Sequence, residues 1–508
     1  MINILEYLES TIERLPSVDK PAFVGDEGFL TFQQLFDKSR SAGTFLCQQG
    51  IYKKPIVVFM EKRPEMIAAF LGVVYSGSYY VPIDAEMPVF RIRLILEAVD
   101  PPLVICDDTT SKLMDEWGLN YPKENFNLMC DCPIHNESLA TIRTRAVDVD
   151  PVYVVFTSGS TGLPKGVIAC HRSIIDYVDN LAKVLDVDAN TVFGNQSPFY
   201  LDACLKEVYN TLKFGATTYI VPKSLFMFPV KLIEYVNEKK INTICWVASA
   251  LSLVAGLGAL DVDVPSTLHT IAFGSEVFPI KHFNRWREVL PDARFIHLYG
   301  PTEATGMSAY YEVRRTFEPD EAIPIGQPFP NTDIILLDDN GKEPPLGEPG
   351  EICIRGAGLS PGYYGDLEKT KAAFVQNPLS AFPDLIYRTG DIGYRGTCGE
   401  LFFISRRDHQ IKHMGHRIEL AEIEMAAARC NGVQMACVVF DKDASKIILY
   451  CMPDIPKAGV MAELKANLPR FMVPNAIFPM ENLPMTPGGK LDRTALLQRY
   501  KDSRAKPK

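Results

Sequence analysis

Short apolar runs alternate with helix-like patterns over the first four hundred residues of the chain. Runs rich in β-branched and aromatic residues are typical of buried strands, whereas apolar residues repeating with the helical period indicate a helix. A helix predicted at residues 64–74 directly follows the first of these runs. The predicted strands cover residues 55–60, 103–106, 152–156, 217–221, 241–247 and 269–273. Strands that alternate with helices indicate βαβ units and mostly parallel sheets, and therefore the α/β fold class.

The pattern changes after a dense polar run at residues 405–410. Beyond this run the sequence predicts a helix at 419–430, strands at 434–440 and 446–452, and a helix at 459–468. These elements would form a compact α+β unit of about one hundred residues. We therefore expect a large domain of βαβ units at residues 1–407 and a small α+β domain at residues 408–508.

The composition is that of an ordinary globular protein. The 508 residues are 47% hydrophobic and 22% charged, and a chain of this length is typically divided into two or more domains. The net charge of −10 disfavours binding to nucleic acid, which requires a basic face. No apolar stretch of about eighteen residues occurs, so no membrane insertion is expected. The N-terminus lacks the basic segment and apolar core of a signal peptide, and the twelve cysteines are scattered. We therefore expect reduced thiols and a cytoplasmic protein.

Residues 157–166 follow the predicted strand 152–156 and combine glycines, hydroxyls and a lysine. Glycines let the backbone fold tightly around an anion, hydroxyls add donors and the lysine adds positive charge, so the segment suits phosphate. It is not a Walker A loop, because Pro164 precedes Lys165 and Gly166 follows it. Composition alone fits a Ser/Gly-rich surface loop equally well. The candidate phosphate-binding residues are Thr157, Ser158, Gly159, Ser160, Thr161, Gly162 and Lys165.

The order of residues in this segment resembles the phosphate loop of the adenylate-forming, or AMP-binding, enzymes. This superfamily includes acyl-CoA synthetases, luciferases and the adenylation domains of nonribosomal peptide synthetases. Further segments that resemble motifs of the superfamily follow the family order, at residues 74–84, 299–303, 387–391, 405–420 and 487–490. One such motif would be weak evidence, whereas the ordered set spans most of the chain. The resemblance implies a large N-terminal domain and a small, mobile C-terminal domain.

The resemblance also implies that the chain uses ATP and Mg²⁺. Forming an acyl adenylate brings a carboxylate to the α-phosphorus of ATP, so catalysis must rest mostly on positioning and charge neutralisation. Glu303 would be the Mg²⁺ ligand, Lys490 would act catalytically beside the reacting carboxylate, and Asp408 would be the hinge. Without the resemblance, Glu303 is explained as a capping glutamate and Lys490 as a solvated lysine in a turn. The other implied nucleotide-binding residues are Gly274, Ser275, Glu276, Tyr299, Gly300, Thr302, Asp391 and Arg406.

The residues that follow Asn195 resemble the start of the amino-acid pocket of adenylation domains. Asp202 would bind the α-ammonium group, and Lys206 lies four residues later on the same helix face. Phe273 and Leu298 are bulky and would shorten the pocket. An acidic amino acid and a small neutral one both remain open. The implied pocket residues are Asp202, Ala203, Lys206, Cys245, Ile271, Phe273, Leu298, Gly306 and Met307.

The function that the resemblance implies is ATP-dependent adenylation of an amino acid. The aminoacyl group would then pass to the phosphopantetheine thiol of a carrier protein, as in nonribosomal peptide synthetases and the stand-alone D-alanine–carrier-protein ligases. One alternative is a carboxylic acid–CoA ligase, and another is a catalytically silent binding protein on the same fold. No carrier domain is recognisable after residue 490, so we expect either a free-standing enzyme or one domain of a larger synthetase.

Overall fold

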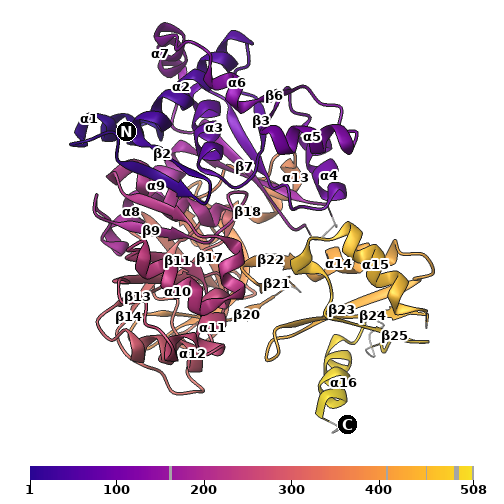
Figure 1. Ribbon diagram of the computed structural model, residues 1–508. Helices are drawn as coiled ribbons and strands as arrows, with labels where there is room; N and C mark the ends of the chain where they lie inside the picture. The colour runs from indigo at the N-terminus through magenta and orange to yellow at the C-terminus, as the bar shows by residue number, and fades with distance from the viewer. Residues whose placement is uncertain (160–162, 408–409, 454, 486–490, 506–508) are drawn as a thin grey trace. The chain divides into compact units, whose positions relative to one another are not determined.

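The computed structural model describes residues 1–159, 163–407, 410–453, 455–485 and 491–505 (Figure 1). The chain forms two compact units. The first consists of Met1–Ala85, Val99–Phe156 and Gly166–Arg407. The second consists of Asp408–Lys508 together with two segments from earlier in the chain, Glu86–Ala98 and Thr157–Lys165.

The largest sheet of the first unit has the strand order β15-β14-β13-β12-β11-β9-β10-β1-β2. Its central strands are parallel, and antiparallel pairs occur at both edges. The strands are β1 (Pro21–Gly25), β2 (Gly28–Thr31), β9 (Val192–Asn195), β10 (Thr217–Ile220), β11 (Thr243–Val247), β12 (Thr270–Gly274), β13 (Arg294–Tyr299), β14 (Ala309–Val313) and β15 (Gln327–Pro328).

A second sheet of this unit has the order β6-β5-β3-β4-β7-β8, with parallel pairing from β6 to β7. Every residue of β3 is buried, as expected for a parallel strand that is covered on both faces. The strands are β3 (Pro55–Phe59), β4 (Tyr79–Ile83), β5 (Val104–Cys106), β6 (Lys123–Asn125), β7 (Pro151–Thr157) and β8 (Lys165–Cys170).

Helices cover both faces of the largest sheet and so create two separate cores. One core contains residues of α1 (Leu5–Arg14), α8 (His171–Leu185) and α9 (Leu205–Phe214). The other contains residues of α10 (Pro229–Glu238), α11 (Ala248–Gly256) and α12 (Ile280–Val289). The remaining helices of the first unit are α2 (Phe32–Gln48), α3 (Pro64–Tyr75), α5 (Asp108–Glu116), α6 (Phe126–Cys130), α7 (Asn136–Arg145) and α13 (Leu367–Ala373). Its short 3-10 turns are η1 (Asp202–Cys204), η2 (Lys223–Met227), η3 (Ala259–Asp261) and η4 (Thr302–Ala304).

An antiparallel sheet completes the first unit, in the order β16-β17-β19-β18 with β20 beside β19. Its strands are β16 (Thr332–Leu337), β17 (Gly350–Gly356), β18 (Phe374–Gln376), β19 (Leu385–Arg395) and β20 (Leu401–Arg406).

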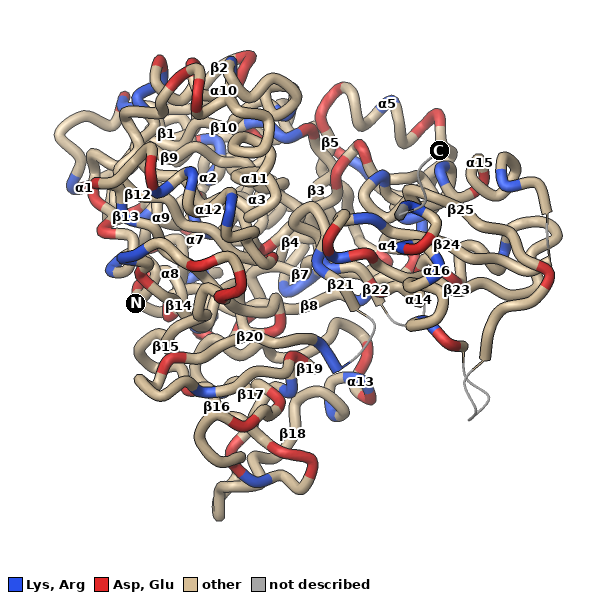
Figure 2. The backbone as a smooth tube through the Cα atoms, turned by 90° about the horizontal axis from the view of Figure 1, so that it is seen from below, with Lys and Arg blue, Asp and Glu red and all other residues tan. Residues whose placement is uncertain are grey.

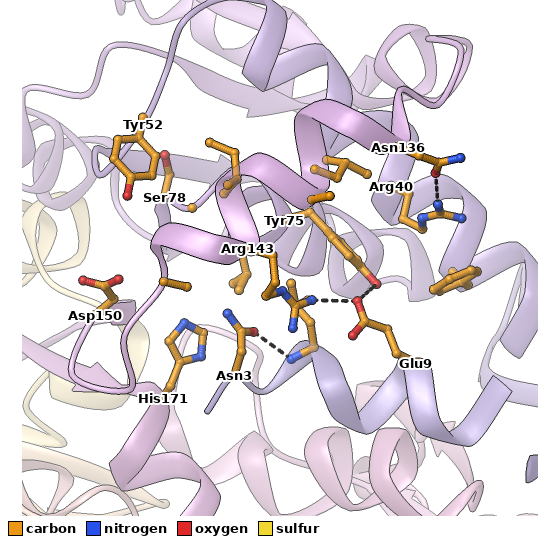
Figure 3. Close-up of a pocket in the computed structure, with 18 of the residues that line it drawn as sticks. Asn3, Glu9, Arg40, Tyr52, Tyr75, Ser78, Asn136, Arg143, Asp150 and His171 are labelled. Atoms are coloured by element: carbon orange, nitrogen blue, oxygen red, sulfur yellow. Dashed lines mark hydrogen bonds and ion pairs between the residues drawn. The ribbon is translucent and has the colours of Figure 1, made fainter. Parts of the chain in front are cut away.

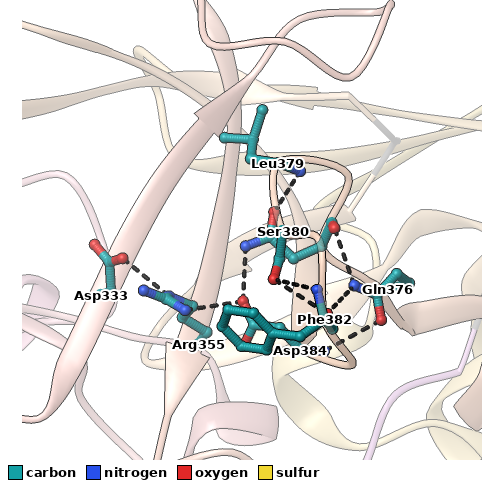
Figure 4. Close-up of polar contacts among 8 residues, drawn as sticks. Asp333, Arg355, Gln376, Leu379, Ser380, Phe382 and Asp384 are labelled. Atoms are coloured by element: carbon teal, nitrogen blue, oxygen red, sulfur yellow. Dashed lines mark hydrogen bonds and ion pairs between the residues drawn. The ribbon is translucent and has the colours of Figure 1, made fainter.

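Side chains brace the loop between β18 and β19 against this sheet (Figure 4). The Asp384 carboxylate accepts hydrogen bonds from Arg355 Nη1 and Asn377 Nδ2, each at 2.8 Å. Arg355 Nε also donates to Asp333 Oδ2 at 3.0 Å. These contacts fix the start of β19, the strand that carries Asp391.

The second unit consists of a β-hairpin and a three-stranded sheet with helices. The pair β21 (Gln410–His413) and β22 (His416–Glu419) is antiparallel, and the sheet has the order β23-β24-β25. The other elements are α4 (Val89–Val99), α14 (Leu420–Ala428), β23 (Met435–Asp441), β24 (Lys446–Met452), α15 (Lys457–Asn467), η5 (Arg470–Met472), β25 (Ala476–Pro479) and α16 (Arg493–Ala505). Within this unit Arg91 Nη1 of α4 donates to Glu422 Oε1 of α14 at 2.6 Å, and both side chains are buried.

The α/β fold class predicted from the sequence is confirmed, and so is each predicted strand and helix, with end residues that differ by a few positions. Lysines and arginines are dispersed among acidic residues along the chain (Figure 2). The cysteines, all within the described residues, form no disulfide. None of the helices that the structure describes combines the length and the apolarity required to span a bilayer.

Close packing of α2 on α3 generates a stability prediction. A Cβ atom at Gly43 would lie 2.5 Å from Tyr75 Cβ, a distance that the packed helices cannot accommodate without separating. We expect Gly43→Ala to lower the free energy of unfolding by about 1–3 kcal/mol, the usual cost of overpacking a core. Urea unfolding followed by tryptophan fluorescence measures this, because all three tryptophans lie in the first unit.

Gly256→Ala is the matched control, because a Cβ atom there would meet His282 only at 3.4 Å. This helical substitution should be neutral or stabilising by up to about 1 kcal/mol. Equal urea midpoints for the two variants would show that α2 and α3 do not pack as described.

Candidate active site

Most of the predicted site residues of the first unit lie beyond the carboxyl ends of neighbouring parallel strands. Asp202 forms η1 after β9, Glu276 follows β12, and Glu303 lies in η4 after β13. In open α/β sheets, ligands bind in the crevice at this edge, where successive loops meet. The topology therefore brings together residues as distant in sequence as Asp202 and Glu303.

Asp391 lies at the centre of a buried polar cluster. Tyr299 Oη donates to Asp391 Oδ2 at 2.6 Å, and Arg406 Nη1 donates to Asp391 Oδ1 at 2.5 Å. The exposed fractions of the Asp391 and Arg406 side chains are 2% and 9%. Burial and the adjacent Asp391 carboxylate raise the pKa of Tyr299. Each carboxylate oxygen keeps one lone pair, so Asp391 can still accept hydrogen bonds from a pair of ribose hydroxyls.

Glu303 is fully buried, and Tyr363 Oη donates to its Oε1 at 2.8 Å. The Ser360 backbone N–H donates to the Glu303 carbonyl at 2.9 Å, which fixes η4 against the following sheet. Mg²⁺ prefers oxygen ligands, and it is commonly held by one or two carboxylates together with phosphate oxygens. Among the described residues, no cluster of three or more His, Cys, Asp or Glu could hold a metal ion by itself. Glu303 thus fits a metal ion that is shared with a nucleotide.

Asp202 is a carboxyl whose environment opposes its charge. Burial raises the pKa of Asp202, a hydrogen bond from Thr302 and the charge of Lys206 lower it, and the Glu303 carboxylate raises it further. Lys206 is 5% exposed, and none of the described residues hydrogen-bonds or forms an ion pair with its ammonium group. The charge of Lys206 acts on both the Asp202 and the Glu207 carboxyl groups and lowers the pKa of each. Asp202 and Lys206 together suit a ligand that carries both an ammonium group and a carboxylate.

Cys245, Leu298 and Met307 lie in one core, on the α8 and α9 face of the largest sheet. Gly306 lies there too, because a Cβ atom on it would be 3.1 Å from Tyr177 Cζ in the same core. Ala203, in η1 beside Asp202, is partly exposed.

Two residues predicted for this pocket lie on the other face of the sheet. Ile271 and Phe273 belong to the core formed with α10, α11 and α12, and Phe273 stacks on His297 with ring centroids 5.0 Å apart. Side chains alternate along a strand, so an assignment shifted by one residue moves both positions to the opposite face. The structure instead places Ala272 opposite Cys245 and Gly274 opposite Leu298. Phe273 therefore does not shorten the pocket.

Strand packing also requires a glycine at position 274. A Cβ atom there would lie 2.2 Å from the Leu298 carbonyl oxygen, so only glycine allows β12 and β13 to approach this closely. Ser275 follows with φ of 66°, in the left-handed region. Glu276 Oε2 accepts from the Ser249 N–H at 3.0 Å, which caps the start of α11. The strained turn after β12 is thus fixed by the helix that follows β11.

Sequence reasoning missed Glu207, which is fully buried next to Lys206. Asn195 Nδ2 lies 3.4 Å from Glu207 Oε2, and Glu207 Oε1 has no hydrogen-bond partner among the described residues. Burial raises the pKa of Glu207 to about 7, although Lys206, Asn195 and Lys62 act in the opposite direction. Burial likewise lowers the pKa of Lys62 to about 8. An adjacent Lys–Glu pair in a sequence is usually explained as a solvated helix surface, so the pattern gave no signal of this site.

A separate cavity of about 590 Å³ lies among α1, α2, α3 and α7 (Figure 3). Glu9 accepts hydrogen bonds there from Arg143 Nη2 at 2.6 Å and Tyr75 Oη at 3.2 Å. His171 Nδ1 accepts from the Ile4 N–H at 3.2 Å, and burial lowers the pKa of His171 to about 4. None of the sequence-predicted site residues lines this cavity. Its polar side chains attach α1 to the rest of the first unit.

Comparison with known proteins identifies the family. Residues 8–364 match the model of the AMP-binding enzymes. The chain belongs to this family. It is 33% identical over 509 residues to tyrocidine synthase 3 of Brevibacillus parabrevis, an alignment that covers 98% of this chain and 8% of the synthase. The chain thus spans less than a tenth of the length of that curated relative.

Two solved structures share the fold. One is a nonribosomal peptide synthetase protein that contains adenylation and PCP domains, with a TM-score of 0.83 and 25% identity over 98% of this chain and 84% of that one. The other is an o-succinylbenzoate CoA synthetase from Bacillus subtilis, with a TM-score of 0.81 and 19% identity over 98% of both chains. Membership in the AMP-binding family implies the use of ATP.

Gly300 of the first unit follows β13, and a Cβ atom on it would lie 2.5 Å from the Gly306 carbonyl oxygen. The other predicted residues of this AMP-binding protein belong to the second unit or lie outside the described residues. Thr157, Ser158, Gly159 and Lys165 group with the second unit, where Ser158 Oγ donates to the Arg417 carbonyl at 2.6 Å. Ser160, Thr161, Gly162, Asp408 and Lys490 lie outside the described residues. The roles assigned to all of these residues stay predictions.

The Glu207 environment generates a prediction for the pH dependence of stability. Because the pKa of Glu207 rises from 4.5 to about 7 on folding, the folded protein binds more protons between these values. The stability contributed by this group is present below pH 4.5 and is lost as the pH rises through about 7. We expect Glu207→Gln to stabilise the first unit more at pH 8 than at pH 5, by roughly 2–3 kcal/mol.

Urea unfolding at both pH values, followed by tryptophan fluorescence, measures this difference. Glu368→Gln is the control, because the Glu368 side chain is 88% exposed and its replacement should give the same small effect at each pH. A Glu207→Gln effect that does not change with pH would contradict the elevated pKa.

Proposed function

We propose that this AMP-binding protein activates an amino acid as its adenylate and transfers the aminoacyl group to the phosphopantetheine thiol of a carrier protein. The observation that carries the proposal is the Asp202 carboxyl, placed near Glu303 in a partly buried site beside Lys206. A carboxylate in such a site requires a cation, and the α-ammonium group of an amino acid supplies one. The similarity to a peptide synthetase that contains adenylation and PCP domains supports the carrier protein as acceptor.

The predicted nucleotide-binding residues would each have a separate role. Asp391 has lone pairs left for the ribose hydroxyls, Glu303 offers a hard oxygen ligand for Mg²⁺, and residues 157–165 would supply N–H and hydroxyl donors to the phosphates. Bound Mg²⁺ would neutralise charge on the phosphate oxygens. The substrate carboxylate is ionised at neutral pH and needs no general base, so the protein contributes orientation and positive charge.

The rival function is a carboxylic acid–CoA ligase. The fold does not separate the two, because an o-succinylbenzoate CoA synthetase shares it at 19% identity. Pyrophosphate exchange into ATP, measured with D- and L-alanine, serine, aspartate and glutamate, tests the amino-acid step. Acceptor assays with CoA and with a phosphopantetheinylated carrier protein then test the transfer step. Exchange with no amino acid would favour a different carboxylate or a catalytically silent protein.

Asp202 and Lys206 generate a prediction about the substrate. We expect Asp202→Asn, which removes only the charge, to abolish exchange with amino acids, because the buried α-ammonium loses its partner. If the substrate side chain is acidic, Lys206→Ala should raise the activation free energy calculated from kcat/KM by about 2–5 kcal/mol, the cost of breaking a buried charge pair. With a small neutral substrate the loss should be mild.

The same amino-acid panel, run on wild type and both variants, gives these values. Undiminished activity of Asp202→Asn on the best amino acid would refute the pocket assignment.

Lys490 generates a prediction that separates the two half-reactions. Its ammonium would lie beside the reacting carboxylate during adenylation, and Asp408 would be the hinge that moves it away for transfer. Lys490→Ala should slow adenylation by about a hundredfold or more, as for other lost transition-state contacts. Transfer from pre-formed adenylate to the carrier should change far less. Lys442→Ala, at an exposed lysine of the same unit, is the control and should alter neither step. Equal losses in both steps would exclude this role.

A further inference from the structure

Tyr177, on α8, reaches the candidate amino-acid pocket although no motif marks it. A Cβ atom on Gly306 would lie 3.1 Å from Tyr177 Cζ and 3.4 Å from Tyr177 Oη. The phenol end of Tyr177 therefore occupies the space that a side chain at residue 306 would fill. Tyr177 also belongs to the same core as Cys245 and Met307.

The Tyr177 hydroxyl is buried and has no hydrogen-bond partner among the described residues. A buried hydroxyl without a partner is costly, so native proteins usually give such a group a partner or a ligand. Burial, followed by the nearby Cys245 and Asp202 groups, raises the pKa of Tyr177, so its hydroxyl stays protonated and can donate. Burial, followed by the Asp202 carboxyl, likewise raises the pKa of Tyr153, whose buried hydroxyl also lacks a hydrogen-bond partner in the described part of the chain.

Two other tyrosine hydroxyls of the same core do have hydrogen-bond partners. The hydroxyls of Tyr80 and Tyr209 are 3.0 Å apart and hydrogen-bond to each other. This core thus pairs one set of tyrosine hydroxyls, whereas those of Tyr153 and Tyr177 have no hydrogen-bond partner within the described ranges. Such a difference is expected where the missing partner is supplied by a ligand.

We propose that Tyr177 is a further specificity-determining residue of the pocket, and that its hydroxyl hydrogen-bonds to a polar side chain of the amino acid: a carboxylate, an amide or a hydroxyl. The inference rests on the proposed function and narrows its substrate class. The nearly fully buried Lys206 supports the same class, because a polar side chain offers its ammonium group a hydrogen-bond acceptor that an apolar side chain lacks. A site built to hydrogen-bond its substrate discriminates strongly against an isostere that lacks the polar atoms.

Tyr177→Phe tests this, because the change removes one oxygen and keeps the ring. Pyrophosphate exchange is measured with isosteric pairs: threonine and valine, aspartate or asparagine and leucine, glutamate or glutamine and methionine. We expect wild type to prefer a polar member, and Tyr177→Phe to lower that polar-to-apolar ratio of kcat/KM by about tenfold or more. Tyr80→Phe is the matched control, because it removes a paired hydroxyl of the same core and should leave the ratio unchanged.

The outcomes separate this inference from the proposed function. Wild-type preference for an apolar amino acid, or an unchanged ratio in a folded Tyr177→Phe protein, would overturn the role of Tyr177 alone. Exchange with no amino acid at all would reject the proposed function and this inference with it. Thermal unfolding of Tyr177→Phe shows that the variant is folded, and removal of an unpaired buried hydroxyl should leave its midpoint equal to that of wild type or higher.

Discussion

Side chains alternate between the two faces of the largest sheet, and this constraint determines which residues can meet in the candidate pocket. β11, β12 and β13 run parallel in register, so Cys245 and Ala272 share one face while Trp246 and Phe273 share the other. Each face is covered by its own helices, and each forms its own core. The pocket can draw only on the face toward α8 and α9, where Leu298 and Tyr177 lie.

Several buried or partly buried charged groups of the first unit lie where the parallel strands end. Asp202, Lys206 and Glu207 lie on one short stretch after β9, and Glu303 approaches them from the loop after β13. Burial opposes the charge of each carboxyl that it perturbs, and the pKa values of Asp202 and Glu207 rise accordingly. Such an arrangement lowers the stability of the fold. Groups with pKa values perturbed in this way cluster at functional sites. The site is thus prepared for a ligand that carries compensating charge.

Much of the fold was predictable from the sequence, because buried parallel strands such as β3 appear as continuous apolar runs. Family resemblance also predicted roles for Asp391, Glu303 and Asp202 through local motifs, and these roles stay predictions. It failed where one residue of register decides the outcome, because Ile271 and Phe273 differ from Ala272 and Gly274 only by the face on which they lie. Tyr177 and Glu207 were missed for another reason: their environments come from distant segments, and neither a tyrosine on a helix nor an adjacent Lys–Glu pair is distinctive in sequence.

The central claim is that the Asp202 carboxyl receives the α-ammonium group of the substrate. The most direct measurement compares pyrophosphate exchange for the best amino acid and for its des-amino analogue, the same carboxylic acid without the α-ammonium. We predict that wild type prefers the amino acid by a hundredfold or more, since loss of the ammonium removes the partner of the Asp202 carboxylate, at a cost of about 3–5 kcal/mol. Equal use of both compounds would contradict it and would indicate a ligase for simple carboxylic acids.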